Sequence, residues 1–127
     1  VFDLGGVVVA GDALQLARVL EGLQGEGAAP PLILWSVTEE IRAIGRVLAL
    51  MASGRPVQQA LREARIWGPR QQLIERNVGR YTARQIEGAL VHAARIDRMV
   101  KGLARGDVWD ELLQLGLRFR RTRAKAA

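Results

Sequence analysis

Apolar residues recur at the spacing of an α-helix along most of the chain. The clearest example follows Pro30 and Pro31, where apolar side chains three or four residues apart would form one stripe over about five helical turns. The members of this stripe are Leu34, Val37, Ile41, Ile44, Leu48 and Met51. No segment alternates cleanly between apolar and polar residues, as a half-buried strand would. The pattern therefore predicts an all-α fold whose longest early helix runs from Pro30 toward Ser53.

Glycines, prolines and capping residues divide the first two thirds of the chain into further helices. A Val-rich segment at 1–9 contains two glycines, so a helix there needs support from packing. Asp12 is suited to cap a helix that ends near Gly25. Prolines open two short helices at 56–64 and 69–79, because proline lacks the N–H donor that a first helical turn leaves unsatisfied.

Two capping signals locate the last two helices. Thr82 and Gln85 have the spacing of a capping box, and the helix that follows them is predicted to stop at Gly106. Its buried side would consist of Ile86, Ala89, Leu90, Ala93, Ile96, Val100 and Leu103. Asp107 is the expected cap of a final helix with a wide apolar surface. The chain is thus predicted to be one compact bundle, 1–127, of about seven helices on short connections.

Composition agrees with a single globular domain. Apolar residues make up 49% of the chain and charged residues 25%, a balance that does not favour disorder. The absence of Cys excludes a disulfide scaffold and thiolate zinc sites. No uncharged apolar stretch is long enough to span a bilayer, so no membrane association is expected. Because the chain begins with Val and has no signal-like start, we expect it to be a piece of a longer protein.

The net charge of +6 is concentrated at the C-terminus. Five cations and no anion occur in the last ten residues, namely Arg118, Arg120, Arg121, Arg123 and Lys125. Without them, the cations nearly match the 13 anions in number. Residues 118–127 are therefore predicted to form a basic tail at the end of the bundle, solvated and disordered rather than bound to nucleic acid.

The residues that usually carry out catalysis are sparse. His92 is the only histidine and has no second ligand at helical metal spacing, so a structural or surface role is expected. The glycine-rich stretch 22–27 follows a helix and matches no nucleotide-binding fingerprint. Adjacent acidic residues cannot converge on one substrate atom, so these pairs are expected on solvated faces: Glu39 with Glu40, and Asp110 with Glu111. No catalytic residue, cofactor or metal ion is predicted, and the three tryptophans, Trp35, Trp67 and Trp109, are expected to be core or interface anchors.

Several motifs, read in register, resemble one protein family. Asp97, Lys101 and Gly102, followed by Trp109 and Leu112, are similar to the D-x-x-x-K-G…W-x-x-L signature that closes the delta subunit of bacterial DNA polymerase III. The stretch 31–42 resembles the family's proline-plus-aliphatic helix start, and Ile66-Trp67 followed by Arg70 resembles its aliphatic-Trp-x-x-Arg element. The family's opening is matched by Phe2, Leu4, Gly11 and Asp12.

The resemblance implies the C-terminal collar domain of a clamp-loader subunit. Such a domain is non-catalytic and packs beside the C-terminal domains of the gamma/tau and delta-prime subunits in a ring, in the bacterial cytoplasm. It would meet the sliding clamp only through an N-terminal part of the subunit, while the parent complex is a DNA polymerase. DNA would be a partner of the assembled complex, and Lys101 and Arg105, near the loop after the long helix, are candidates for a phosphate contact.

Two readings from other classes stay open. The basic tail, together with the two short helices around Trp67, would suit a free-standing helical nucleic-acid-binding module. The near-neutral body of the chain argues against that reading. A small helical enzyme would need a base or a metal site that the residue inventory does not suggest.

Overall fold

The computed structural model describes residues 4–121, which form a helical bundle. Its elements are α1 (Leu4–Ala10), α2 (Ala13–Gly25), α3 (Pro30–Ala52), α4 (Val57–Glu63), α5 (Pro69–Asn77), the 3₁₀ turn η1 (Val78–Arg80), α6 (Ala83–Val100) and α7 (Val108–Leu117). No β-strand occurs between residues 4 and 121. The predicted all-α class and the expected seven helices are confirmed. None of these helices is both long enough and apolar enough to cross a bilayer.

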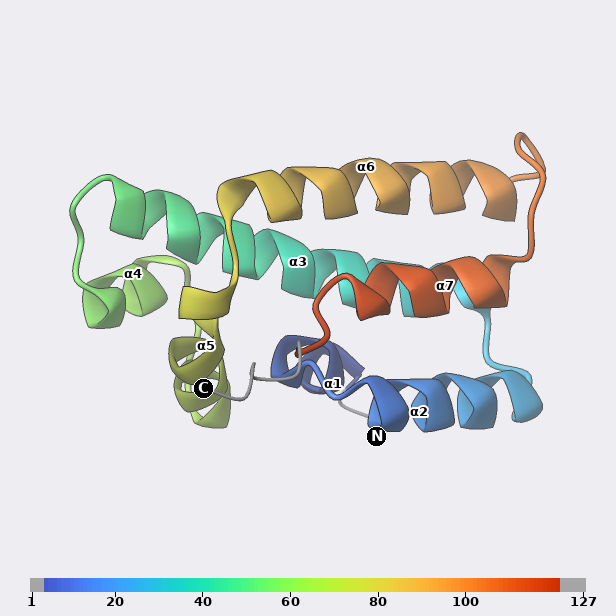
Figure 1. Ribbon diagram of the computed structural model, residues 1–127, viewed down its shortest axis with the longest axis horizontal. Helices are drawn as coiled ribbons and strands as arrows, with labels where there is room; N and C mark the ends of the chain where they lie inside the picture. The colour runs from blue at the N-terminus through green and yellow to red at the C-terminus, as the bar shows by residue number, and fades with distance from the viewer. Residues whose placement is uncertain (1–3, 122–127) are drawn as a thin grey trace, which may run out of the picture.

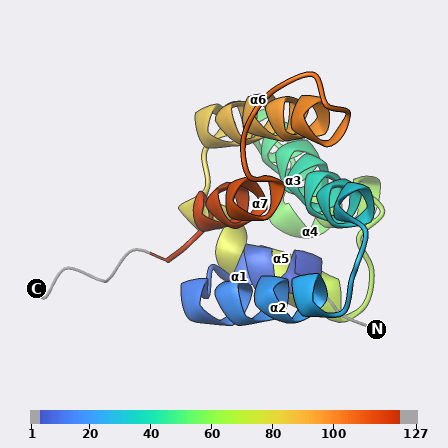
Figure 2. The ribbon, with the colours of Figure 1, turned by 90° about the vertical axis from the view of Figure 1, so that its right-hand side faces the viewer.

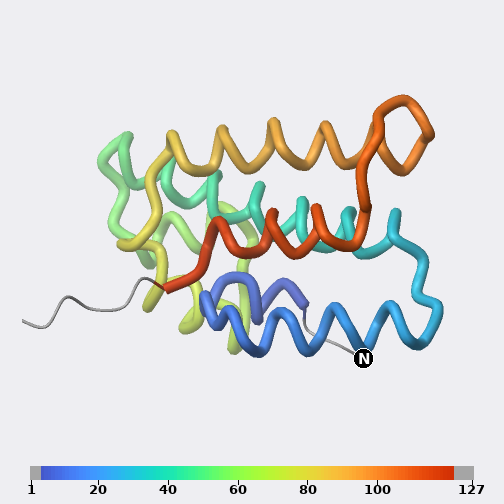
Figure 3. Tube along the Cα trace, turned by 45° about the vertical axis from the view of Figure 1, so that its right-hand side comes forward, coloured from blue at the N-terminus to red at the C-terminus, as the bar shows by residue number. Residues whose placement is uncertain are grey.

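Helix α3 lies at the centre of the bundle. It packs against α6 on one side and against α1 and α4 on the other, and it also contacts α7. Helix α2 covers α7 and α1, as the end-on view shows (Figure 2). The long helices α3 and α6 lie side by side, while α4 and α5 close one end of the bundle (Figures 1 and 3).

The central position of α3 explains why its buried surface is wider than the predicted stripe. The first four stripe residues, Leu34, Val37, Ile41 and Ile44, are buried, whereas Leu48 and Met51 are half-buried. Four further residues of α3 are buried as well: Ile33, Glu40, Ala43 and Val47. A helix enclosed from two sides buries more than the arc of roughly 100° that a surface helix buries.

The three predicted helix caps are present, and the helices that follow them begin where the sequence predicts. The Asp12 carboxylate accepts a hydrogen bond from the Gln15 amide at 3.0 Å, and Asp107 does the same for Asp110 at 3.2 Å. Thr82 and Gln85 form the reciprocal capping box. These bonds satisfy amides that have no partner inside the first turn of a helix.

Helix α6 ends earlier than predicted. Gly102 has φ +76°, and the Leu103 amide donates to the Arg98 carbonyl at 2.8 Å, which together form a Schellman motif directly after Val100. Leu103 is consequently 66% exposed, so its predicted place on the buried side of this helix is wrong. The glycine at 102, which tolerates the left-handed conformation, stops the helix before Gly106 is reached.

The segment after α7 is bound to the bundle as far as the structure describes it. Phe119 is fully buried and meets the Tyr81 ring edge to face, with ring centroids 5.3 Å apart. The Arg121 amide donates to the Gly11 carbonyl at 2.8 Å, and its Nε donates to the Ala10 carbonyl at 2.8 Å. Residues 118–121 of the segment assigned to a basic tail therefore belong to the packed domain, and 122–127 lie outside the described residues.

Gly11 makes this approach of the two chain segments possible. Its φ is +73°, and a Cβ at this position would lie 2.6 Å from the Phe119 carbonyl oxygen. Such a distance is far inside van der Waals contact, and the opposing atom belongs to the backbone. Only glycine fits both the conformation and the space.

Candidate functional site

The residues of the D-x-x-x-K-G motif together form the end of α6. Asp97 and Lys101 are one helical turn apart and form an ion pair of 2.7 Å between Oδ2 and Nζ. Gly102 supplies the left-handed residue of the Schellman motif that follows. An exposed pair at this spacing and a glycine after the last turn stabilise a helix end in many proteins. Lys101 is thus already paired with a carboxylate.

Arg105, the second candidate for a phosphate contact, lies in the loop between α6 and α7 and is exposed. It follows Lys101 by four residues, and a phosphate contact by these two cations stays a prediction.

Trp109 and Leu112 of the W-x-x-L motif pack into the domain. Leu112 is buried in the core, and Trp109 is half-buried at the start of α7. Trp109 borders a shallow hollow between α7 and α2, together with Leu20 and Leu113. Both motif residues thus help to hold α7 on its neighbours.

The other two tryptophans point outward. Trp35 is 64% exposed and Trp67 is 60% exposed, so neither is a core anchor. Trp35 lies on α3 at the rim of a groove of about 500 Å³ between α3 and α6. This α3–α6 groove is lined by Pro31, Leu34, Trp35, Thr38, Arg42, Leu90, Ala93, Ala94 and Asp97. The structure thus brings Trp35 and Asp97, two of the predicted site residues, to one surface.

Further apolar side chains extend the surface of the groove. Leu32 precedes Trp35 by about one turn of α3, and Val91 precedes Ala94 by about one turn of α6. Leu32 is 67% exposed and Val91 is 73% exposed. The charged groups of the groove are already paired, because Arg42 binds Glu39 at 3.0 Å and Asp97 binds Lys101. An apolar surface whose charges are compensated suits the packing of another helix.

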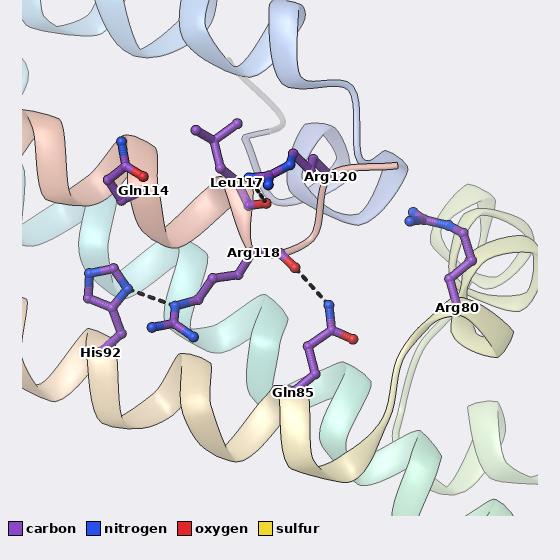
Figure 4. Close-up of a pocket in the computed structure, with 7 residues that line it drawn as sticks. All are labelled: Arg80, Gln85, His92, Gln114, Leu117, Arg118 and Arg120. Carbon is purple, nitrogen blue, oxygen red and sulfur yellow. Dashed lines mark hydrogen bonds between the residues drawn. The ribbon is translucent and has the colours of Figure 1, made fainter. Parts of the chain in front are cut away.

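Another pocket brings together residues that no motif in the sequence connects. It is an open pocket of about 720 Å³ beside the first half of α6 and the end of α7 (Figure 4). The residues that line this arginine pocket are Arg80, Gln85, His92, Gln114, Leu117, Arg118 and Arg120. Three of them are cationic arginines and none is acidic.

His92 links α6 to the pocket and to α7. Its Nε2 lies 2.9 Å from Oε1 of Glu111, and its Nδ1 accepts a hydrogen bond of 2.9 Å from Nε of Arg118. Because Nδ1 is an acceptor, the ring carries its proton on Nε2 and donates it to the carboxylate. Both ring nitrogens are occupied, so the arrangement holds Arg118 in place and does not present a free base.

One member of each acidic pair faces inward, contrary to the predicted solvated faces. Glu40 is buried, and its Oε1 accepts a hydrogen bond of 2.9 Å from Arg70. Glu111 is half-buried and accepts from His92. The prediction failed because α5 and α6 each supply a hydrogen-bond donor that the sequence spacing does not reveal.

Arg80 is held at the opposite side of the pocket by neutral acceptors. Its Nη2 donates to the Val9 carbonyl at 3.0 Å, to Oδ1 of Asn77 at 3.0 Å and to the Tyr81 hydroxyl at 2.7 Å. The Tyr81 hydroxyl in turn donates to the Val9 carbonyl. Burial raises the pKa of Tyr81 above its usual 10.0, although the nearby charges of Arg80 and Arg121 act in the opposite direction.

The sequence alone could not predict that these residues meet in one pocket. Arg80 follows α5, His92 lies on α6, and Arg118 and Arg120 follow α7, so their meeting depends on how the helices pack. The one sequence feature related to the pocket is the excess of cations near the C-terminus, and that feature by itself predicts a solvated tail. Among the residues that the structure describes, no cluster of three or more potential metal ligands occurs.

Comparisons of the chain with protein-family models, with curated proteins and with solved structures found no match.

Proposed function

We propose that this chain is an assembly domain that binds a neighbouring helical domain along the α3–α6 groove. The observation that carries the proposal is the exposure of Trp35 at the rim of that groove. Tryptophan is the residue most enriched among those that dominate binding energy at protein interfaces. Leaving such a side chain in water is unfavourable, and a partner that covers it gains the free energy of burying a large apolar surface.

The shape of the groove favours a helix as its occupant. Two long helices that lie side by side leave a furrow into which the side chains of a third helix can pack. Leu32 and Val91 widen the apolar surface beyond the groove itself. Because the cations and anions of the groove are paired within the chain, a partner helix would need apolar residues at helical spacing and few charges.

The resemblance to the delta subunit of bacterial DNA polymerase III suggests which domain that partner is. On this proposal the chain is the collar domain of a clamp loader and packs beside the C-terminal domains of gamma/tau or delta-prime, in the cytoplasm. The domain itself would be non-catalytic, and the sliding clamp and DNA would be partners of the assembled loader. A ring in which neighbours meet head to tail uses a different surface for each neighbour, so the groove would serve one of two contacts.

Co-purification tests this proposal. The chain is mixed with the C-terminal domains of gamma/tau and delta-prime from the same genome, and the mass of any complex is measured. We expect a complex with one copy of this chain, and we expect Trp35→Ala to weaken it at least tenfold, as interface tryptophans typically do.

Trp67→Ala is the matched control, because Trp67 is almost equally exposed and does not line the groove. Equal losses of binding in the two variants would show that the groove is not the docking surface. Failure of the unaltered chain to bind either domain would end the clamp-loader proposal.

The nucleic-acid-binding alternative is tested by deleting residues 122–127 and not the whole segment 118–127. Removing 118–127 would also remove Phe119 and Arg121, which hold the bundle together. A deletion of 122–127 removes Arg123 and Lys125 and leaves these contacts intact. Salt-dependent binding of DNA that disappears with this deletion would support a role for the tail.

A further inference from the structure

The arginine pocket has an excess of positive charge, and no carboxylate of residues 4–121 forms an ion pair with its three arginines. Ion pairs between residues 4 and 121 involve Arg42, Arg55, Arg70, His92 and Lys101, and none involves Arg80, Arg118 or Arg120. The acceptors of these three arginines are backbone carbonyls, an amide, a hydroxyl and an imidazole, all of them neutral. Three guanidinium charges thus border one cavity without a carboxylate among its lining residues.

The guanidinium groups of Arg80 and Arg118 are held in place before any ligand arrives. Arg118 is fixed through Nε by His92, and no acceptor within residues 4–121 binds its two terminal nitrogens (Figure 4). Arg80 is fixed by the Val9 carbonyl and by Asn77. A ligand therefore does not have to pay the full entropy cost of ordering these side chains, which favours binding.

The guanidinium group of Arg80 also shares an acceptor with that of Arg121, a residue that does not line the pocket. Nη2 of Arg80 and Nη2 of Arg121 donate to the same oxygen, Oδ1 of Asn77, at 3.0 and 3.3 Å. Like charges that share one acceptor repel each other, and neither arginine forms an ion pair within residues 4–121. A multiply charged anion in the pocket would relieve this repulsion.

The geometry points to a binding site for ligands that carry several phosphate groups, and we propose this role for the arginine pocket. Guanidinium groups match phosphate oxygens in planar, two-pronged hydrogen bonds, and a phosphate carries more charge than a carboxylate. The Gln114 amide lines the same cavity and adds a neutral donor, whereas Nε2 of Gln85 already donates to the Arg118 carbonyl at 2.7 Å. A volume of about 720 Å³ is larger than a single phosphate needs, so a chain of phosphates fits better. This proposal does not depend on the assembly role of the α3–α6 groove.

Two sources could supply such a ligand, and one experiment separates them. The full chain is titrated with inorganic tripolyphosphate by calorimetry, and with a fluorescent oligothymidine by anisotropy, each at low and at high salt. Binding of tripolyphosphate alone would identify a small polyphosphate, whereas binding of the oligothymidine would identify a nucleic-acid backbone.

The decisive variant is Arg118→Gln with Arg120→Gln, which removes two pocket charges. The matched control is Arg95→Gln with Arg98→Gln, because these are exposed arginines on α6 that do not line the pocket and make no described side-chain bond. We expect the pocket variant to bind at least about tenfold more weakly and the control to change less than about twofold.

The single variant Arg120→Gln separates a loss of binding from a loss of folding. The side chain of Arg120 makes one described hydrogen bond, which is long, at 3.4 Å to the Leu117 carbonyl. We expect this single variant to keep the thermal stability of the unaltered chain and still to weaken binding. Equal losses in the pocket and control variants would overturn the proposal, because they would indicate nonspecific charge attraction. Failure of both ligands to bind the unaltered chain at low salt would also overturn it.

Discussion

Phe119 offers the sharpest test of the packing at the end of the chain. Its ring has no exposed surface and lies against Tyr81, yet it stands within a run of arginines that the sequence assigns to a solvated tail. If the ring is a core residue, truncation to alanine must cost a large share of the stability. If the segment is solvated, the same change should cost almost nothing.

The magnitude follows from the burial of the ring. Phe→Ala in a fully buried site costs about 3–5 kcal/mol, which includes the transfer of the ring and the cavity left behind. The upper half of this range applies, because the hydrogen bond between Arg121 and Gly11 holds the backbone beside the cavity and limits its collapse. For a chain of this size the midpoint of thermal unfolding should fall by about 10–20 °C.

Chemical denaturation followed by tryptophan fluorescence measures the effect, with two comparison variants. Phe119→Leu should lose about 1.5 kcal/mol, since most of the volume is kept. Val91→Ala removes an apolar group that is 73% exposed and should change stability by less than about 0.5 kcal/mol. A loss below about 1 kcal/mol for Phe119→Ala would refute the packing described for residues 118–121.

Three further predictions concern individual residues. Gly11→Ala should cost more than about 2 kcal/mol in denaturant unfolding, because the added Cβ meets the Phe119 carbonyl and φ is +73°; a neutral effect would contradict this close approach. Arg65 has φ +60° in a Schellman motif, so Arg65→Gly should stabilise the domain by about 0.5–1 kcal/mol. Gly102 has φ +76°, so Gly102→Ala should destabilise the domain by about 1 kcal/mol. Effects of the opposite sign would refute the conformations assigned to these two residues. The raised pKa of Tyr81, the single tyrosine, means that this residue ionises first in the unfolded chain. Its contribution to stability should therefore be constant below about pH 10 and be lost as the pH rises above that value; titration of the absorbance at 295 nm checks this, and a midpoint at or below 10.0 in the folded protein would contradict it.

Local signals predicted most of the fold, because each is completed within a few residues. The capping box at Thr82 and the cap at Asp12 depend only on neighbours three positions away, and both formed as expected. The burial of Glu40 depends on its hydrogen bond with Arg70, which lies thirty residues later in the chain and on another helix. Leu103 was assigned to a helix because its spacing fits, whereas the glycine before it ends that helix.

The candidate surfaces were harder to predict because each is formed by residues from separate helices. The D-x-x-x-K-G run forms an ion pair and supplies the glycine that ends α6, and its Asp97 also lines the α3–α6 groove. The exposure of Trp35 depends on how α3 and α6 pack against each other, and the spacing of apolar residues within one helix does not specify that packing. The arginine pocket draws on three separate parts of the chain, and only the packed structure brings them together.

The hydrogen bonds from Arg121 to Ala10 and Gly11 join positions that lie 111 and 110 residues apart. During synthesis, α1 would lack these two hydrogen bonds until the residues up to Arg121 have left the ribosome. In a nascent chain, α1 should therefore remain sensitive to proteases until Arg121 emerges. Protection from proteolysis should then arise abruptly, and not in steps as each helix is completed.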